Sequence, residues 1–361
     1  MIAGHYSVVV AGGRVAGAVT AWALAPYAES VLVVDASQAT SFWPQQATWD
    51  RAGNLLWSDL GLLDTVLACG APRTYGHTLR VDDDVVEHDY PQQDGYSYRM
   101  TLPREVLDPA LLRAAESRGN VTVLRPARVS DLSVSAVTGG GGRVRGVTVR
   151  QGGVDRQVSC DLLVLADGRL SRNADRLGAE PYRVVPSPWV ALLAYFEDLP
   201  LRSDRGYFSS QPGSLAISTP CGPNQWCVST DMHQRLIDES GGHPARQYAR
   251  IIAEDPHIGP AVKVGRQVSK LGGAGKLKMQ RRPMSGPGWC LVGDAGYHLD
   301  PVTARGTKSA LTAARILRDR IVETGGIDGG RLGGLTEQRD AELEADWLAA
   351  EELCQPAPVP S

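Results

Sequence analysis

Hydrophobic and polar positions alternate along the chain in a way that predicts both helices and strands. Residues 8–11 form a short apolar strand, residues 17–25 repeat apolar side chains at helical spacing, and residues 30–36 form a second buried strand. This order predicts a β-α-β unit whose second strand ends near Asp35. The same helical spacing predicts further helices over residues 49–70, 104–119, 243–255, 307–324 and 335–353.

A different pattern fills the middle of the chain. Period-two alternation predicts strands over residues 78–90, 95–101, 121–137, 143–151, 189–199, 205–210, 213–220 and 225–232. The strands between residues 181 and 282 read as one antiparallel sheet with the helix 243–255 over it. Because Gly139–Gly142 stands between two alternating segments, we interpret it as a hairpin turn and not as a nucleotide loop.

Composition narrows the class of protein. The 361 residues are 43% hydrophobic and 21% charged, with a net charge of −3, which is typical of a globular chain and not of a nucleic-acid-binding surface. Because the first residues include no basic segment followed by an apolar run, we expect no secretory signal. No apolar run approaches the roughly 20 residues of a membrane span. The six cysteines fit neither a metal site nor a disulfide framework. We expect a cytoplasmic protein without bound metal and with cysteines such as Cys160 and Cys290 in its core.

The first candidate motif is the turn Gly12-Gly13-Arg14-Val15-Ala16-Gly17, between the first strand and the first helix. The dinucleotide fingerprint G-x-G-x-x-G has glycine where Arg14 stands, and that glycine allows close backbone approach to a pyrophosphate. A helix N-terminus still offers N–H groups to an anion, and Arg14 would add a full cation. The alternative is that Arg14 marks a decayed site. Asp35 is placed to accept hydrogen bonds from the ribose hydroxyls of an adenosine, or it is a solvated strand end.

Two more apolar strands end in Asp-Gly or Gly-Asp pairs. Leu162–Leu165 leads to Asp167 and Gly168, and Cys290–Val292 leads to Gly293 and Asp294. Asp294 is a candidate acceptor for a ribityl hydroxyl, and a helix beginning near Thr303 would direct its N–H groups at a polarised ring carbonyl. Any one of these motifs fits an ordinary strand end, whereas their order and spacing together point to a single cofactor site.

The combination resembles the group A flavoprotein hydroxylases, FAD-dependent monooxygenases of the p-hydroxybenzoate hydroxylase fold. Members carry the glycine turn, an A-D-G-x-x-S segment as in Ala166-Asp167-Gly168…Ser171, and G-D-A followed by a proline, as in Gly293-Asp294-Ala295…Pro301. Arg104 matches the arginine of an R-x-x-L helix start that reaches FAD in the family. The similarity covers about residues 6–325. It implies a mixed α/β fold: a Rossmann-like FAD-binding domain with an inserted antiparallel β-sheet substrate domain.

A branch of this family is more similar still. It has G-x-R-x-x-G in the first motif and G-D-A-G-Y-x-x-D-P-x-T-A-x-G in the third, which residues 293–306 match. In that light Arg14 is a feature of the branch. The common family loop after this proline is P-x-x-G-x-G-x-N, whereas in this chain Pro301 is followed by Ala304, Gly306 and Lys308. Ala304 and Lys308 therefore stand where the family has a glycine and an asparagine. The resemblance implies this set of FAD-binding residues: Gly12, Gly13, Arg14, Ala16, Gly17, Asp35, Arg104, Asp167, Gly168, Gly293, Asp294, Pro301, Ala304 and Gly306.

The resemblance also implies a domain division. We expect residues 1–75, 100–180 and 283–325 to form the FAD-binding domain and residues 76–99 and 181–282 the substrate domain. A C-terminal helix over residues 326–354 and a disordered tail over residues 355–361 follow.

The implied reaction uses NADH or NADPH to reduce FAD, after which a flavin C4a-hydroperoxide passes one oxygen atom of O₂ to an aromatic or other activated small molecule, in secondary metabolism. His298 is the candidate proton-handling residue, or else a histidine packed under the flavin loop. Arg305 either holds an anionic substrate or the flavin pyrimidine, or it lies at the surface. Tyr195, Tyr207 and Trp226 either line an aromatic pocket or belong to the core.

Other functions share these motifs. A flavin halogenase shares the fold, but the chain has no W-x-W-x-I-P segment. A flavin-dependent reductase or desaturase without oxygen insertion, and a non-catalytic FAD-fold subunit, remain alternatives. The expected partners are a small-molecule substrate, O₂ and NAD(P)H, with no nucleic acid and no membrane span, for a monomer or homodimer.

Overall fold

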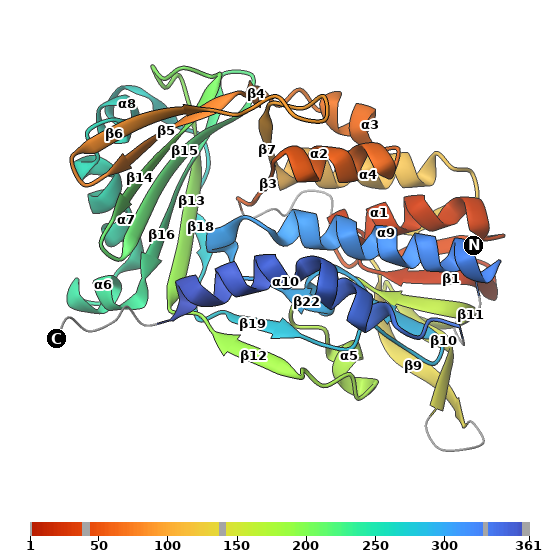
Figure 1. Cartoon of the computed structure of the whole chain (residues 1–361). Helices are drawn as coiled ribbons and strands as arrows, with labels where there is room; N and C mark the ends of the chain where they lie inside the picture. Colours follow the sequence, from red (N-terminus) through yellow and green to blue (C-terminus); the bar gives the residue numbers. More distant parts are fainter. Residues whose placement is uncertain (1, 38–43, 137–141, 328–330, 356–361) are drawn as a thin grey trace.

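A computed structural model describes residues 2–37, 44–136, 142–327 and 331–355. A parallel sheet forms the centre of the larger half of the molecule (Figure 1). Its strands, in spatial order, are β8 (Val121–Leu124), β2 (Val31–Val34), β1 (His5–Ala11), β11 (Val154–Leu165) and β21 (Trp289–Leu291), with the short antiparallel β20 (Ser285–Gly286) at the edge. Their central residues are apolar and fully buried, because helices or strands cover both faces.

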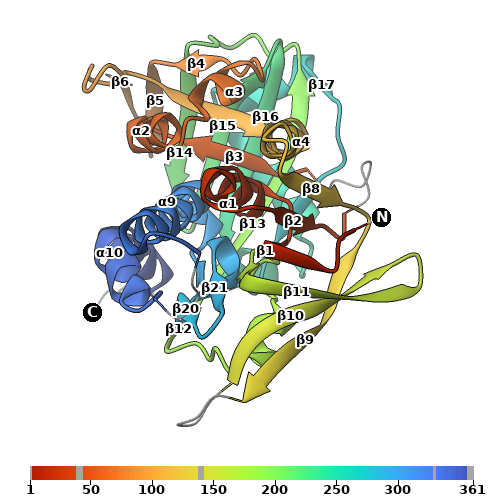
Figure 2. The same ribbon diagram turned by 90° about the vertical axis from the view of Figure 1, so that its right-hand side faces the viewer.

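Helices cover one face of this sheet. The first helix, α1 (Val15–Leu24), is followed by the short η1 (Ala25–Tyr27) and packs against α4 (Arg104–Glu116) and α9 (Gly306–Thr324). Beyond them, α2 (Arg51–Asp59) contacts α9, and α3 (Leu63–Leu67) contacts α4. Figure 2 shows these helices on one side of β1. The β-α-β unit and the helices predicted over 49–70, 104–119 and 307–324 are therefore confirmed.

An antiparallel meander covers the other face. It consists of β9 (Arg128–Ala136), β10 (Gly142–Gln151) and the first half of β11. The prediction of one strand over residues 121–137 is wrong, because β8 joins the parallel sheet and β9 joins the meander. Pro126 stands between them and has no N–H to donate to a strand ladder. The antiparallel pairing of β9 and β10 agrees with a hairpin, although Gly139–Gly141 of its predicted turn lie outside the described residues.

The second half of the molecule is a mostly antiparallel sheet, drawn at the left of Figure 1. Its order is β17 (Arg266–Gln267), β13 (Trp189–Glu197), β16 (Gln225–His233), β15 (Ser214–Gly222), β14 (Arg205–Gln211), β5 (Gly76–Val81) and β6 (Asp84–Asp89), with β18 (Gly272–Ala274) beside β13. We call it the substrate sheet. The helices α6 (Gln234–Glu239), α7 (Pro244–Glu254) and α8 (Ile258–Val264) follow β16, and α7 packs on β13, β15 and β16.

Two small sheets join the halves and differ from expectation. Residues 95–101 do not extend the hairpin of β5 and β6, because β7 (Arg99–Pro103) pairs with β3 (Gln46–Trp49) and β4 (Arg73–Thr74). Likewise, β12 (Arg183–Pro186) and β19 (Lys278–Arg281) do not enter the substrate sheet but pair with each other, and β19 pairs with β22 (Tyr297–His298). The expected single sheet over residues 181–282 is thus two sheets.

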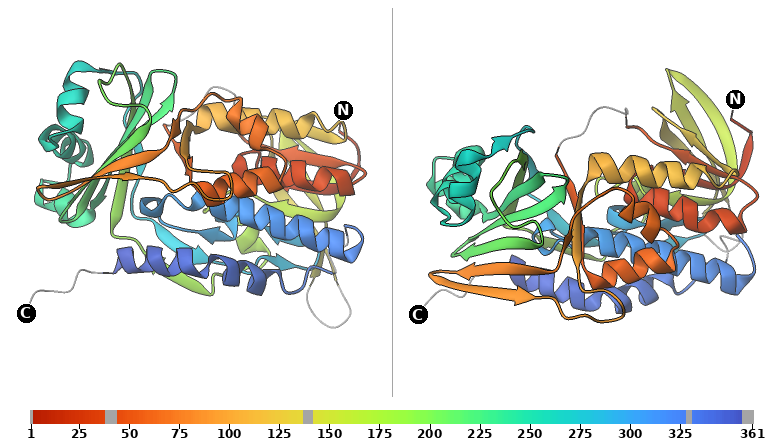
Figure 3. Two further views of the ribbon diagram at one scale, coloured as in Figure 1. Left: turned by 45° about the horizontal axis from the view of Figure 1, so that its top comes forward. Right: turned by 90° about the horizontal axis from the view of Figure 1, so that it is seen from above.

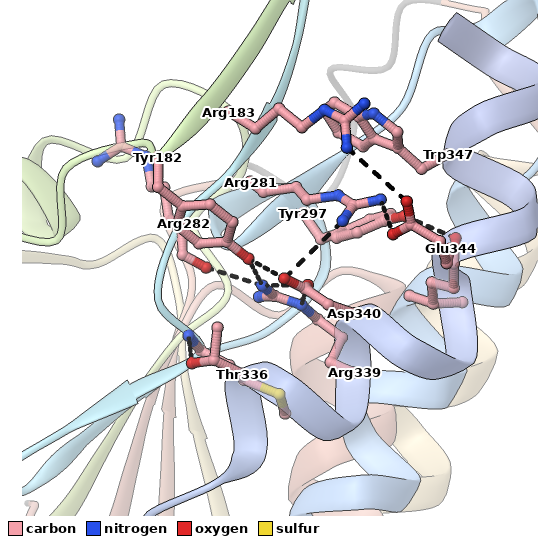
Figure 4. A network of polar contacts seen from close by, with 12 residues as sticks. Tyr182, Arg183, Arg281, Arg282, Tyr297, Thr336, Arg339, Asp340, Glu344 and Trp347 are labelled. Atoms are coloured by element: carbon pink, nitrogen blue, oxygen red, sulfur yellow. Dashed lines mark hydrogen bonds and ion pairs between the residues drawn. The ribbon is translucent and has the colours of Figure 1, made fainter.

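The C-terminal helix, α10 (Leu335–Cys354), runs beside α9 along the length of the molecule (Figure 3). Buried arginines attach it. Arg339 is 1% exposed and donates to the carbonyl oxygens of Arg282 and Gly296. Arg281, from β19, lies over the rings of Tyr297 and Trp347 (Figure 4). The helix predicted over 335–353 is confirmed, and residues 356–361 of the predicted tail lie outside the described residues.

Within the described ranges, no helix is long and apolar enough to span a membrane, and no three His, Cys, Asp or Glu side chains are grouped as metal ligands. Cys160 and Cys290 lie in the core, as expected.

Candidate active site

The three motifs meet at the carboxyl ends of neighbouring parallel strands. Gly12 follows β1, Ala166 follows β11 and Gly293 follows β21, and these strands lie side by side. Backbone hydrogen bonds link their ends: the Ala166 N–H donates to Ala11 O at 2.8 Å. In open α/β sheets ligands bind at this edge.

Small residues let α1 approach the strand ends closely. Gly12 has φ +105°, and a Cβ there would lie 2.4 Å from the Ala166 carbonyl oxygen. A Cβ on Gly17 would lie 1.8 Å from the Gly12 oxygen, and one on Gly293 would lie 2.6 Å from Ala16 Cβ. The glycine positions and Ala16 are therefore required by packing of the first motif on the second and third. The first N–H groups of α1 have no acceptor within the helix and remain for an anion.

Asp35 lies beside this turn. Its side chain is 6% exposed, and its carboxylate accepts hydrogen bonds from the N–H groups of Gly13 at 2.7 Å and Ser37 at 2.6 Å. A Cβ on Gly13 would lie 2.4 Å from Asp35 Oδ2, so glycine is needed for this contact. Asp35 and Gly13 line an open depression at the surface, which is also lined by Arg14 and Arg125. This donor and acceptor set fits the adenosine diphosphate part of FAD.

Arg14 is the residue before α1. Its backbone has φ −80° and ψ −171°, an ordinary extended conformation, so this position does not require glycine on backbone grounds. The side chain is exposed, and its Nη1 donates to Gln45 Oε1 at 3.2 Å. Arg14 therefore lines the same depression as Asp35 and Arg125, with its side chain exposed.

Arg104 begins α4 and forms a two-pronged ion pair within its own helix. Its Nε and Nη2 donate to the two carboxylate oxygens of Asp108 at 2.6 and 2.9 Å. Burial raises the pKa of Asp108, and Arg104 acts against this rise. Arg104 also lowers the pKa of Asp294, which places its charge near the third motif. Asp108 was missed in the sequence, although its position four residues after Arg104 on a predicted helix is a recognisable signal.

The second motif is held by its own short helix. Ser171 caps α5 (Arg172–Arg176) by accepting from the Ala174 N–H at 3.1 Å, and Asn173 donates to Asp167 Oδ2 at 3.0 Å. Burial raises the pKa of Asp167, against the effect of the hydrogen bonds from Ser171 and Asn173. Gly168 has φ +86°, and a Cβ there would meet only open space, so glycine is required by the backbone conformation and not by packing.

The third motif brings Asp294 and His298 together. Asp294, in the turn η2 (Gly293–Ala295), is half exposed, and His298 Nδ1 lies 3.6 Å from its Oδ1. Partial removal from water raises the pKa of Asp294, but the neighbouring His298 and the charges of Arg104 and Arg169 together outweigh this effect, and the pKa falls below its usual value. His298 is 6% exposed, and its Nε2 has no hydrogen-bond partner among the described residues.

The loop after Asp294 differs from expectation in one respect. The helix does not begin near Thr303: a short turn, η3 (Pro301–Thr303), comes first, and α9 begins at Gly306. Between them Ala304 has φ +52°, a left-handed conformation in which glycine is the usual residue. The Asp300 carboxylate accepts from the Val302 N–H at 2.9 Å and stabilises η3. The N–H groups of α9 thus start three residues later than predicted.

Two cations after this turn have partners. Arg305 Nη1 lies 3.2 Å from Asp50 Oδ2, and Lys308 Nζ lies 2.7 Å from Asp346 Oδ2 on α10. Burial raises the pKa of Asp50, but Arg305 and other contacts lower it overall. Lys308, which departs from the common family pattern, is therefore matched by a carboxylate on α10. Sequence reasoning missed Asp346, because a single acid in an acidic helix carries no distinguishing signal.

Of the two possibilities for Tyr195, Tyr207 and Trp226, an aromatic pocket or the core, the structure favours the core. Tyr207 and Trp226 lie with ring centroids 6.2 Å apart on the side of the substrate sheet that α7 covers, so they belong to the core. Tyr195 faces the opposite side, and its hydroxyl donates to the Gln45 carbonyl at 2.6 Å. Successive side chains of a strand point to opposite faces of the sheet. Trp226 pairs with Phe196, the residue after Tyr195, so Tyr195 and Trp226 lie on opposite faces.

Comparisons with known proteins agree with this arrangement. The sequence pattern of the FAD binding domain family matches residues 5–324. Squalene monooxygenase SE1 of Panax ginseng is 24% identical over 88% of this chain, and squalene epoxidase 3 of Arabidopsis thaliana is 22% identical over 86%. The chain spans 59% of the length of each of these relatives.

Solved structures show the same fold. PqsL of P. aeruginosa, in complex with 2-aminobenzoylacetate, superposes with a TM-score of 0.81 at 20% identity over 97% of this chain and 96% of its own. The myxobacterial chondrochloren halogenase CndH superposes with a TM-score of 0.80 at 21% identity over 99% of this chain and 84% of its own. Since a family pattern covers nearly the whole of the described molecule, the chain belongs to the FAD binding domain family, the flavoenzyme family that its three motifs resemble.

Proposed function

We propose that this protein is a FAD-dependent monooxygenase that inserts one oxygen atom of O₂ into an aromatic or other activated small molecule. NADH or NADPH would supply the electrons. The observation that carries the proposal is the meeting of the three motifs at one sheet edge, with glycines where a Cβ would clash. PqsL, a structural neighbour, was solved with 2-aminobenzoylacetate, and the curated relatives are squalene monooxygenases.

We propose a division of labour among the FAD-binding residues. Gly12, Gly13, Arg14, Gly17 and Asp35 would hold the adenosine diphosphate part, because backbone N–H groups, a cation and a ribose acceptor lie together there. Arg104 would supply a positive charge between the adenosine diphosphate part and the third motif.

The third motif would hold the other end of the cofactor. Asp294 would accept a hydrogen bond from the ribityl chain, and Pro301, Ala304 and Gly306 would shape the loop under the ring. FAD, when bound and reduced, supplies the activation of O₂. The N-terminus of α9 would stabilise negative charge, and His298 would hold a proton beside Asp294.

The first test is the identity of the cofactor. We expect FAD, and neither FMN nor NAD, to be released when the purified protein is heated, because Asp35 and the glycine turn fit an adenosine diphosphate. Mass spectrometry of the released cofactor reads this directly. Release of FMN alone would contradict the assignment.

The second test concerns the reaction. Oxidation of NADH or NADPH in the presence of candidate aromatic substrates, followed by mass spectrometry of products made under ¹⁸O₂, would reveal an oxygen atom derived from O₂. Products that are only reduced or desaturated would instead support a flavin-dependent reductase or desaturase. Full FAD occupancy without stimulated NAD(P)H oxidation would support a non-catalytic subunit.

A further inference from the structure

The two faces of the substrate sheet have different neighbours. Even-numbered residues of β13, β15 and β16, such as Phe196, Ala216 and Val228, pack with the helices α7 and α8 in one hydrophobic cluster. The odd-numbered residues form the opposite face, which we call the inner face. This face looks toward the FAD-binding half, since β13 contacts η3, β15 contacts β7 and Tyr195 donates to Gln45.

One part of the inner face, around Tyr195 and Cys227, is buried, whereas another part is apolar and partly exposed. Ala191, Leu193, Leu215 and Ile217 are all partly exposed, although they lie in the interior strands of the sheet. Their even-numbered neighbours Val190, Ala194 and Ala216 are buried. These four side chains of the inner face are therefore accessible in part, and the strand β13 that carries two of them contacts η3 in the loop of the third motif.

One carboxylate lies in the middle of this apolar face. Asp231, on β16, is 6% exposed and has no hydrogen-bond or ion-pair partner for its side chain among the described residues. Its cross-strand neighbours are Ala191 and Leu215, which offer nothing polar from their side chains. The other acid of the inner face, Glu197, lies at the end of β13 and pairs with Arg266. A buried carboxylate without a donor is costly.

The loop of the third motif brings a second acid near Asp231. Asp300 is 2% exposed, and while its Oδ1 accepts from Val302, its Oδ2 is buried without a partner. Burial, together with the charge of Asp300, raises the pKa of Asp231 to about 7. The other titratable side chains of β16 on this face are Cys227 and His233.

We propose that Asp231 recognises the substrate by accepting a hydrogen bond from an O–H or N–H group on an electron-rich aromatic ring. The proposal rests on the monooxygenase function proposed above. The apolar neighbours Leu193 and Ile217 suit the ring, and the donor would satisfy the carboxylate that the protein leaves unpaired. A hydrogen bond to a carboxylate also raises the electron density of a phenol or indole ring, which favours attack on an electrophilic oxygen.

The test uses phenol and anisole, which differ in one O–H group. We expect the FAD-loaded protein at about pH 8 to bind phenol roughly tenfold or more tightly than anisole, as a charge-assisted hydrogen bond allows. Ligand-observed NMR titrations give both affinities. In Asp231→Leu the preference should vanish, whereas Asp84→Leu, which removes an exposed carboxylate on β6, should keep it. Equal affinity of the wild-type protein for the two probes, including binding of neither, would overturn the proposal.

Thermal unfolding measured over a range of pH tests Asp231 without any ligand or activity assay. The pKa of Asp231 in the folded protein lies above its ordinary value of 3.8, so folding loses stability as pH rises toward about 7. Asp231→Asn removes this loss, and its Tm should rise relative to the wild type as pH increases from about 4 to about 8. A constant difference in Tm would contradict the buried, unpaired carboxylate.

The phenol preference itself should weaken below about pH 7, where Asp231 binds a proton and no longer accepts as a carboxylate. In Asp231→Asn the preference for phenol over anisole should no longer depend on pH. If the preference and its pH dependence appear but no oxygenated product forms from any substrate, the proposed function fails and the role of Asp231 stands. If oxygenated product forms but Asp231→Leu binds phenol and anisole with the same preference as the wild type, the proposed function stands and the role of Asp231 fails.

Discussion

Gly12 and Arg14 lie two residues apart in one turn, but only the position of Gly12 requires glycine. Gly12 has φ +105°, and a Cβ added to it would lie only 2.4 Å from the Ala166 carbonyl oxygen. No other residue therefore fits at this position without displacement of the strand ends. Arg14 has an ordinary extended backbone and an exposed side chain. The backbone of this protein therefore does not require glycine at this position. In the common fingerprint, glycine is needed there because the ligand approaches the backbone closely.

We expect Arg14→Gly to weaken FAD binding, although it restores the common fingerprint in sequence. The guanidinium lines the depression beside Asp35, and a charge-assisted contact to the pyrophosphate is worth roughly 1.5–3 kcal/mol, or about tenfold or more in affinity. Arg14→Lys should keep part of the affinity, because the charge remains but the planar fork does not.

Titration of FAD into apoprotein of the wild type and both Arg14 variants, at low and high salt, measures these affinities. Salt should reduce the advantage of the wild type, since the contact is exposed. Unchanged or tighter binding by Arg14→Gly would mean that the arginine is only a tolerated substitution, held outward by Gln45.

Asp294 offers a second prediction at this scale. We expect Asp294→Ala to weaken FAD retention roughly tenfold or more, because it removes an ionised acceptor at the end of a buried parallel strand. Asp84→Ala, in the exposed hairpin of β5 and β6, is the matched control and should retain FAD fully. Equal flavin absorbance in both purified variants would contradict the assignment of the third motif.

At the scale of elements, α10 is attached by charge and aromatic contact as much as by apolar packing. Arg339 donates to two backbone carbonyls and to the Tyr182 hydroxyl at 2.8 Å, and it lies over the ring of Tyr297 (Figure 4). We expect Arg339→Ala to cost about 3–5 kcal/mol of folding stability, because it removes a fully buried cation that pairs with Asp340 and leaves the buried Arg282 carbonyl oxygen without its donor.

The matched control for Arg339 is Arg235→Ala, whose side chain is 66% exposed and pairs only with Glu239 one helical turn away. Such surface pairs contribute at most about 1 kcal/mol. Thermal unfolding of both variants compares them under the same conditions. Similar Tm values for the two variants would show that the buried network does not hold α10 in place.

Sequence patterning predicted most elements but not every partner of those elements. The β-α-β unit and the strands over 189–232 were recognisable because their apolar periodicity is local. The role of α10 was not, since its buried Arg339 and Asp346 look like the solvated face of an acidic helix. Their partners, Arg282 and Lys308, come from distant segments. The same limit hid Asp231, whose position on an apolar face becomes meaningful only beside Asp300.

At the scale of the whole molecule, the arrangement of motifs around one sheet edge followed from the sequence, because three strand ends with glycine and aspartate imply parallel neighbours. The order β8-β2-β1-β11-β21 supplies what the sequence alone did not: which strands touch. The contacts between the halves were also beyond prediction. Gln45, for example, joins Arg14, Arg104 and Tyr195 through its side chain and carbonyl, and nothing in its local sequence marks it.

The strand order also constrains how the chain is made in the cell. The central strand β1 emerges from the ribosome before its neighbour β11, which begins to pair with it only at Ser159, 154 residues after His5. At about 5–20 residues per second this interval lasts roughly 8–30 s. During that time one hydrogen-bonding edge of the strand Val8–Val10, fully buried in the finished protein, has no native partner. Nascent chains of this protein therefore present a hydrophobic strand edge that chaperones are suited to shield until synthesis reaches β11.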